Sequence, residues 1–181
     1  MKNLFTLLFF ILLGTWISAQ KYITKIGNIH FEASVPLFED VDAKNSTAVT
    51  VLNSETGDIA TIAMTKNFKF KMALMEEHFN ENYAETSKYP KATFTGKILN
   101  YNKSNISETP KDFTISGTLN FHGVDNKISS PAKIYMKDGK IFISGKFSVK
   151  AADYKVTIPK MVMKKVAETV NVDYQYVLTK Q

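Results

Sequence analysis

The chain has 181 residues and no cysteine, and because it contains no arginine, all 23 of its basic residues are lysines. Against 17 acidic residues they leave a net charge of +6, and they are spread along the chain without a block of like charge. Nucleic-acid readers and bidentate phosphate sites depend on the planar guanidinium group of arginine, so nucleic acid is not expected as a partner. Without cysteine, the fold is held together without disulfides.

The first twenty residues have the pattern of a secretory signal peptide. Lys2 is followed by an uncharged apolar run, residues 4–13, and then by the small pair Ser18 and Ala19. This order of charged, apolar and small residues is typical of a cleaved leader, and the run is too short for a membrane-spanning helix. We therefore expect residues 1–19 to be removed by cleavage near Ala19, and the mature protein to be periplasmic or secreted.

The remaining residues, 20–181, are enough for one domain, carry a charge of +5, and contain no run long enough for a spanning helix, so stable membrane insertion is not expected. Most of this domain alternates apolar and polar residues, which predicts half-buried strands. The Asp-Gly pair at 138–139 predicts a two-residue hairpin between two of them. The expected strands are residues 22–27, 30–38, 48–53, 59–64, 92–100, 113–121, 127–136, 140–158 with a break near Ala151, and 170–179. Their spacing predicts an all-β antiparallel barrel or sandwich.

One segment interrupts this alternation. Met72, Met75, Phe79 and Tyr83 recur at spacings of three, four and four, which predicts a helix of about three turns with one apolar face. The pair at 89–90, Tyr-Pro, ends this segment, because the residue before a proline is disfavoured in helical geometry. A single amphipathic helix among strands is well placed to cover one end of a barrel. A second, weaker helical turn or lid is expected at residues 159–168.

Three motifs carry a family resemblance: EEHFNENYAETSKYPKATFTGKI (76–98), ISGTLNFHGVDNKISSPAKI (115–134) and GKFSVKAADYKVTIP (145–159). In this order they resemble the YceI-like family over nearly the whole mature chain. The resemblance implies a lipocalin-like antiparallel eight-stranded β-barrel with a short helix covering one end. It also implies an elongated apolar pocket that binds a polyisoprenoid or a related amphiphile in the periplasm. Since the chain has no arginine, any headgroup contact that relatives make through arginine falls to a lysine here or is missing.

The histidines do not predict a catalytic or metal site. His78 lies beside two glutamates, but neighbours in sequence on a helix point in different directions, so we expect it to brace the helix against the barrel rim. His30 and His122 lie in or at the end of expected strands, without a zinc-ligand spacing, and His122 is expected to form a local hydrogen bond in a turn. No serine-nucleophile elbow, P-loop or dinucleotide motif occurs. We therefore expect no enzyme activity, no metal and no cofactor apart from a bound lipid.

The interior of an eight-stranded barrel is just wide enough for packed side chains or for one slim ligand. Alternation alone does not separate these two cases, and the family resemblance favours the ligand. The expected wall residues are Phe94, Phe113, Ile115, Leu119, Phe121, Ile141, Ile143, Phe147, Tyr174 and Tyr176, with Met75, Phe79 and Tyr83 closing one end.

Two other functions stay open at this level, a structural or stress-response barrel with a self-filled core and a lipid-modifying enzyme. A membrane-spanning barrel shares the same alternation but does not fit the helix insert and the unequal strands. An isoprenoid quinone, a prenyl phosphate and a fatty-acid derivative all fit the expected ligand class. The chain length and head of the ligand, the delivery partner and the oligomeric state, including a homodimer, are not fixed by the sequence.

Overall fold

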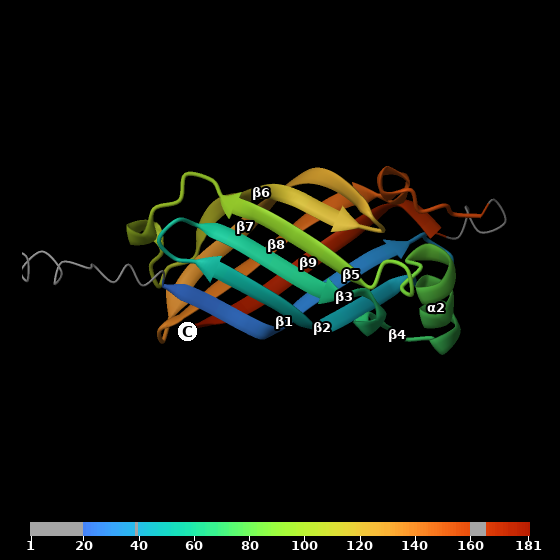
Figure 1. Cartoon of the computed structure of the whole chain (residues 1–181), viewed down its shortest axis with the longest axis horizontal. Coiled ribbons are helices and arrows are strands. Elements are labelled where there is room, and N and C mark those ends of the chain that lie inside the picture. Colours follow the sequence, from blue (N-terminus) through green and yellow to red (C-terminus); the bar gives the residue numbers. More distant parts are fainter. Residues whose placement is uncertain (1–19, 39, 160–165) are drawn as a thin grey trace, which may run out of the picture.

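The computed structural model describes residues 20–38, 40–159 and 166–181, so the expected signal peptide, residues 1–19, lies outside the described residues. Nine strands are present in these residues (Figure 1): β1 Lys21–Ser34, β2 Asp42–Asn53, β3 Asp58–Met64, β4 Lys69–Phe70, β5 Lys91–Ile98, β6 Lys111–Phe121, β7 Val124–Lys137, β8 Lys140–Lys150 and β9 Val166–Lys180. The helix α2 is Ala73–His78, and the short turns are η1 Thr65–Asn67, η2 Phe79–Tyr83, η3 Lys103–Asn105 and η4 Ala151–Tyr154.

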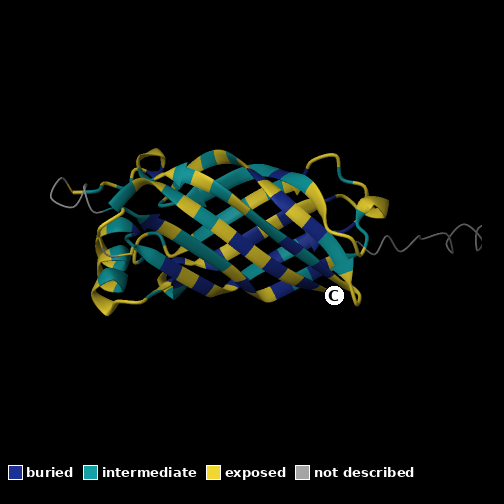
Figure 2. Ribbon diagram, turned by 180° about the vertical axis from the view of Figure 1, so that it is seen from behind, coloured by how far each residue is buried: buried dark blue, intermediate teal, exposed yellow. Residues whose placement is uncertain are grey.

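The strands form a closed antiparallel barrel. Their order is β1-β9-β8-β7-β6-β5-β3-β2, and the pairing of β1 with β2 closes the ring of eight, while the two-residue β4 adds to the edge of β2. Buried and exposed residues alternate along the strands, as half-buried walls require (Figure 2). The expected all-β, eight-stranded barrel is therefore confirmed.

Two of the expected strands, 22–27 and 30–38, are one strand in the structure. At Gly27 the register between β1 and β2 shifts without a turn. A side chain on Gly27 would approach the ring of Tyr176 to 2.8 Å, so this position needs glycine because an aromatic ring packs directly on the backbone. The next strand also starts earlier than expected, at Asp42.

The remaining elements agree more closely with the expectations. The helix runs from Ala73–His78 straight into a π-helical turn, Phe79–Tyr83, and lies at one end of the barrel (Figure 1). Strand β8 ends at Lys150, where η4 produces the expected break. Of the second helical turn expected at 159–168, residues 160–165 lie outside the described residues, and β9 starts at Val166.

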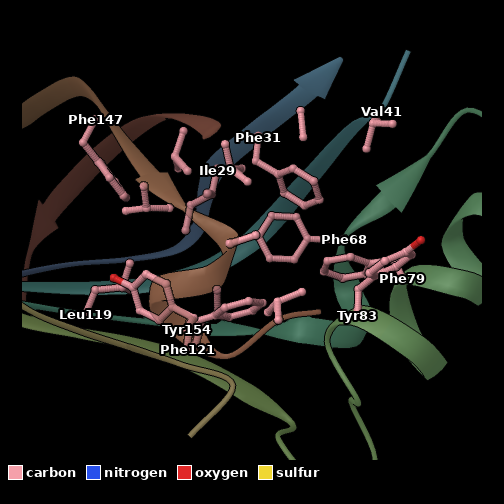
Figure 3. Close-up of a pocket in the computed structure, with 18 of the residues that line it drawn as sticks. Ile29, Phe31, Val41, Phe68, Phe79, Tyr83, Leu119, Phe121, Phe147 and Tyr154 are labelled. Carbon is pink, nitrogen blue, oxygen red and sulfur yellow. The ribbon is translucent and has the colours of Figure 1, made fainter. Parts of the chain in front are cut away.

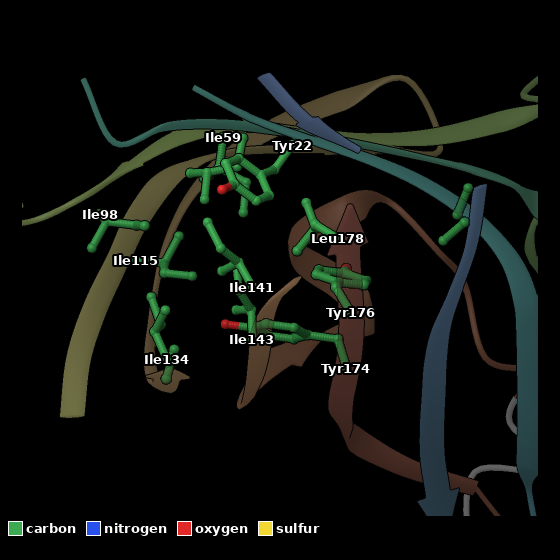
Figure 4. Packing of buried hydrophobic residues seen from close by; sticks show 14 of the residues in the cluster. Tyr22, Ile59, Ile98, Ile115, Ile134, Ile141, Ile143, Tyr174, Tyr176 and Leu178 are labelled. Carbon is green, nitrogen blue, oxygen red and sulfur yellow. The ribbon is translucent and has the colours of Figure 1, made fainter. Parts of the chain in front are cut away.

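The barrel interior is divided into two halves. In the half opposite α2, aliphatic side chains from several strands pack on one another (Figure 4); they include Leu52, Ile98, Ile134, Ile141, Ile143 and Leu178, all at most 1 % exposed. This half is a conventional close-packed core. We call it the closed half, and the half next to α2 the open half.

Candidate ligand-binding site

The open half contains a cavity of about 660 Å³. Its wall is almost entirely aliphatic and aromatic, and it reaches the surface near α2, where exposed residues such as Leu37 and His78 form the rim. Pockets that bind small molecules are typically apolar hollows of about 300–1,000 Å³. The size and lining of this cavity therefore suit an apolar chain.

A cluster of phenylalanines attaches the helical cover to the barrel (Figure 3). Phe79 of the cover lies 5.4 Å, between ring centroids, from Phe31 of β1 and 5.2 Å from Phe70 of β4, and Phe68 lies 5.3 Å from Phe31. Such tilted aromatic pairs contribute beyond the area that they bury. The cover is thus held by ring contacts that line the cavity mouth.

Hydroxyl groups form the floor between the two halves. The rings of Tyr174 and Tyr176 stack at 5.2 Å, the Tyr174 hydroxyl lies 3.0 Å from the Ser130 Oγ, and the Thr50 and Thr61 hydroxyls lie 2.9 Å apart. Burial raises the pKa of both tyrosines. Because these hydroxyls bond to one another, they need no polar group from a ligand, and the floor can face the end of an apolar chain.

Ten of the thirteen expected wall and cover residues line the cavity: Phe94, Ile115, Leu119, Phe121, Phe147, Tyr174, Tyr176, Met75, Phe79 and Tyr83. Phe113, Ile141 and Ile143 do not; Ile141 and Ile143 lie in the packed core and Phe113 packs against it. The reason is the position of these three residues along the barrel axis. Alternation identifies the face of a strand, but not whether a residue on that face lies in the closed or the open half.

Sequence reasoning missed Phe31, Phe68 and Phe70 and also Tyr154, all of which line the cavity. Two signals were available for the first three. Phe31 belongs to an expected strand, and Phe68 and Phe70 alternate with polar residues just before the helix. Tyr154 follows the expected break in the strand run, and no pattern indicates that a turn residue points into a barrel.

The histidines take part in long-range contacts. The ring of His122 is 9 % exposed and bonds through Nε2 to a Glu85 carboxylate oxygen at 2.6 Å and through Nδ1 to the Tyr154 carbonyl at 3.0 Å. The expected local hydrogen bond of His122 is therefore replaced by bonds to two distant segments. His30 faces outward between Asp42, at 2.6 Å, and Asp173, at 2.7 Å. Among the described residues, no three or more histidine, aspartate or glutamate side chains form a group that could hold a metal ion.

His78 is exposed at the rim of the cavity. Its neighbour Glu76 pairs instead with Lys69, and this ion pair connects α2 to β4. The His78 imidazole and the Glu76 carboxylate therefore do not form a common site. In the part of the chain that the structure covers, no helix combines the length and the apolar character that a membrane span requires.

The model of the YceI-like domain matches residues 23–178 of the chain. Among solved structures, a polyisoprenoid-binding domain from Saccharophagus degradans superposes with a TM-score of 0.74 at 16% sequence identity, covering 90% of this chain and 99% of that one. BcnA from Burkholderia cenocepacia has a TM-score of 0.70 at 12% identity over 84% of this chain and 96% of its own. A YceI protein from Campylobacter jejuni gives 0.57 at 19% identity over 75% and 80%. No sequence of a curated protein matches the chain.

Proposed function

Because the chain belongs to the YceI-like domain family, we propose that it binds a polyisoprenoid or a related amphiphilic lipid in the barrel and stores or carries it without chemical change. The observation that carries this proposal is the apolar cavity of about 660 Å³ in the open half. The fold neighbour from Saccharophagus degradans is a polyisoprenoid-binding domain, which supports the ligand class.

The energetics favour a site dominated by the chain of the ligand. Burying about twenty carbons at ~0.8 kcal/mol each gives roughly 16 kcal/mol, before the costs of ordering and desolvation are subtracted. Contacts to the head then adjust selectivity rather than supply most of the affinity. The same interior argues against a wholly self-filled barrel, because only the closed half is packed.

The proposed location follows from the signal-peptide pattern of residues 1–19 together with the family. A carrier in the periplasm or outside the cell meets lipids that have no free passage through water. Sequestration in the open half would shield such a chain from solvent. The proposal includes no catalytic residue and no metal.

The first test is to purify the mature protein from its own periplasm, extract it with organic solvent and analyse the extract by mass spectrometry. We expect a prenyl chain, a quinone or another long amphiphile in a stoichiometric amount. A folded protein that yields no lipid, and that also fails to bind the uncharged fluorescent probe N-phenylnaphthylamine, would contradict the proposal.

A matched pair of variants locates the binding. Phe147→Asp places a charge on the cavity wall, whereas Phe142→Asp places one on the outer face of the same strand, where Phe142 stacks on Tyr135. We expect only the first to abolish probe binding, because an unpaired carboxylate is costly in an apolar cavity. Equal binding by both folded variants would show that the probe does not enter the barrel.

A further inference from the structure

The wall of the barrel is interrupted between β7 and β8. The ladder between these strands runs from the hairpin pair Lys137 and Lys140 to the pair Ala132 and Gly145, and it ends there. Both strands continue toward the open half: residues 124–131 stay paired with β6, and residues 146–150 stay paired with β9. We call the gap between these two stretches the seam.

The sequence explains why the ladder stops. The carbonyl of Pro131 points toward β8, because a side chain on Gly145 would lie 2.7 Å from the carbonyl oxygen. In an antiparallel strand the amide and the carbonyl of one residue face the same side. Proline has no amide hydrogen, so the hydrogen bond that position 131 would donate to β8 is missing. Continuing the register would place Lys127 directly opposite Lys150. Like charges at directly opposed positions destabilise a pair of strands.

The seam is a hollow of about 500 Å³ that adjoins the main cavity. Ile128, Phe147, Val149 and Tyr154 line both spaces, so the same side chains border the seam and the cavity. The outer part of the seam is polar, and its lining includes Asn126, Lys127, Ser129, Ser148, Lys150 and Asp153. An apolar chamber therefore adjoins a polar, lysine-bearing slot.

Tyr154 stands between the two spaces. Its hydroxyl is buried, lies close to the Asn126 side chain, and makes no hydrogen bond of standard geometry among the described residues. The residue is 2 % exposed, and its hydroxyl points into the interior, away from Phe79 and Tyr83 of the cover (Figure 3). A buried hydroxyl without a partner costs stability, so one that is kept in a wall is available to a ligand. Its backbone is fixed, because the Tyr154 carbonyl accepts a hydrogen bond from His122 and the Asp153 carbonyl accepts one from Asn126 at 2.7 Å.

The backbone of the seam adds further donors. Hydrogen-bonded residues alternate along an antiparallel ladder, and the hairpin pair Phe121 and Val124 sets this alternation for β7. The amides of Lys127 and Ser129 therefore face the seam, whereas that of Ile128 faces β6. The carbonyls of Lys127 and Ser129 face the seam as well, and Asp153 adds one carboxylate to its lining. The donors are two lysines, the Tyr154 hydroxyl and two amides that pair with no strand among the described residues, and together they suit an anionic group rich in acceptor oxygens.

We propose that the seam between β7 and β8 holds the anionic head, a phosphate or a carboxylate, of the amphiphile whose chain fills the cavity. Lys127 and Lys150 lie on either side of the head, and the Tyr154 hydroxyl donates to it from within. An anion between the lysines relieves their mutual repulsion, so the feature that opens the wall also favours the ligand. This subsite rests on the proposed lipid-binding function.

The test compares the affinities of geranylgeranyl phosphate, geranylgeraniol and arachidonic acid, measured by displacement of N-phenylnaphthylamine. Lys127→Gln with Lys150→Gln should weaken binding of the phosphate and of the fatty acid about tenfold and leave the alcohol and the probe within about twofold. The control, Lys25→Gln with Lys180→Gln, removes the same charge at the closed end and should change nothing. Tyr154→Phe should lower the affinity for the phosphate, the alcohol and the fatty acid several-fold and leave the affinity for the probe unchanged. The variant should fold, because the substitution removes an unpaired hydroxyl.

A second readout does not depend on affinity. Because the chain has no cysteine, Ser148→Cys provides a single thiol in the seam, and Ser144→Cys provides one on the same strand in the paired part of the ladder. Geranylgeranyl phosphate should slow alkylation of the first thiol by iodoacetamide several-fold and not that of the second.

The outcomes separate the two proposals. If the probe and all ligands fail to bind the unaltered protein, the lipid-binding function and the subsite both fall. If the ligands bind but the lysine pair behaves as its control and both thiols react alike, the subsite is overturned and the function stands. If the lysine pair affects the binding of only the phosphate or only the carboxylate, that result would support the subsite and identify the head group that it holds.

Discussion

At the scale of single residues, His30 joins three strands on the outside of the open half. Both of its ring nitrogens lie near carboxylates, Asp42 on β2 and Asp173 on β9, and a carboxylate only accepts hydrogen bonds, so both nitrogens must donate. Burial alone would lower the pKa of His30. The hydrogen bonds to Asp42 and Asp173 outweigh burial and raise this pKa above its ordinary value of 6.5. The hydrogen bond from His30 in turn lowers the pKa of Asp42.

These shifts predict a pH dependence of stability. A raised pKa in the folded state means that His30 stabilises the fold fully below pH 6.5, and that this contribution is lost as the pH rises through the folded value. Asp42 acts in the opposite sense, since its contribution is lost when the pH falls through its lowered pKa. The triad is therefore strongest in mildly acidic solution, between the two pKa values.

We expect His30→Gln to lower the free energy of unfolding by about 0.5–1 kcal/mol near pH 5.5 and by less near pH 8.5, after allowance for solvent screening. Urea denaturation at the two pH values measures the difference. His78→Gln, which removes an exposed imidazole at the cavity rim, is the control and should show no such change. A loss for His30→Gln that is larger in alkaline solution would show that the triad does not hold a protonated ring.

At the scale of elements, a pair of glycines lets β5 and β6 pack without side chains between them. Gly96 of β5 lies directly opposite Gly117 of β6, and the ring of Phe94 covers both. A side chain on Gly117 would collide with the Thr95 carbonyl and come within 2.7 Å of the Phe94 ring. These glycines thus let an aromatic wall residue lie flat against the sheet.

Gly117→Ala should therefore lower the free energy of unfolding by about 1–3 kcal/mol, because backbone atoms must move to make room. Gly139→Ala is the matched comparison. A side chain there would meet nothing within 4 Å, and only its positive φ of 71° opposes the change. It should cost about 1 kcal/mol. Thermal denaturation followed by circular dichroism compares the two, and equal losses would contradict the steric explanation.

The alternation of the sequence predicted most elements, because a period of two and a period of 3.6 are imposed by burial itself. It did not show that Gly27 bends one strand instead of ending it, since a bulge and a turn share the same residue types. The seam also left only a faint trace. Pro131 inside an expected strand signals a missing ladder bond, but the sequence does not say which neighbour loses it.

The same limit explains why three of the expected wall residues lie outside the cavity. Ile143 and Phe147 lie on the same face of β8, and alternation treats them alike, yet one packs in the core and the other lines the cavity. Whether a residue is packed or lines the cavity depends on the side chains that other strands contribute at the same position along the barrel axis. Tyr154 was missed for a related reason, because the direction of a turn residue depends on contacts such as that with His122.

At the scale of the whole molecule, the closed half supplies stability and the open half supplies binding. Two leucines test this division with identical chemistry. Leu178→Ala empties a fully buried site and should cost about 2–5 kcal/mol. Leu119→Ala enlarges an existing cavity and should cost about 1 kcal/mol.

Binding of N-phenylnaphthylamine should respond in the reverse order, with a severalfold change in affinity for Leu119→Ala and none for Leu178→Ala at a temperature where both are folded. Urea denaturation and probe titration give the two quantities for each variant. If both substitutions altered stability and affinity in parallel, the interior would behave as one continuous space.

Hydrogen exchange tests the division and the seam in one experiment. Amides of the closed half should exchange slowest, because they open only when the whole barrel unfolds. In the open half, the amides of Lys127 and Ser129 should exchange far faster than those of Ile128 and Ser130, which bond to β6. Geranylgeranyl phosphate should then slow the first pair, because its oxygens accept from them. A ladder that closed in solution would protect all four amides equally without ligand, and the slot for the head would not exist.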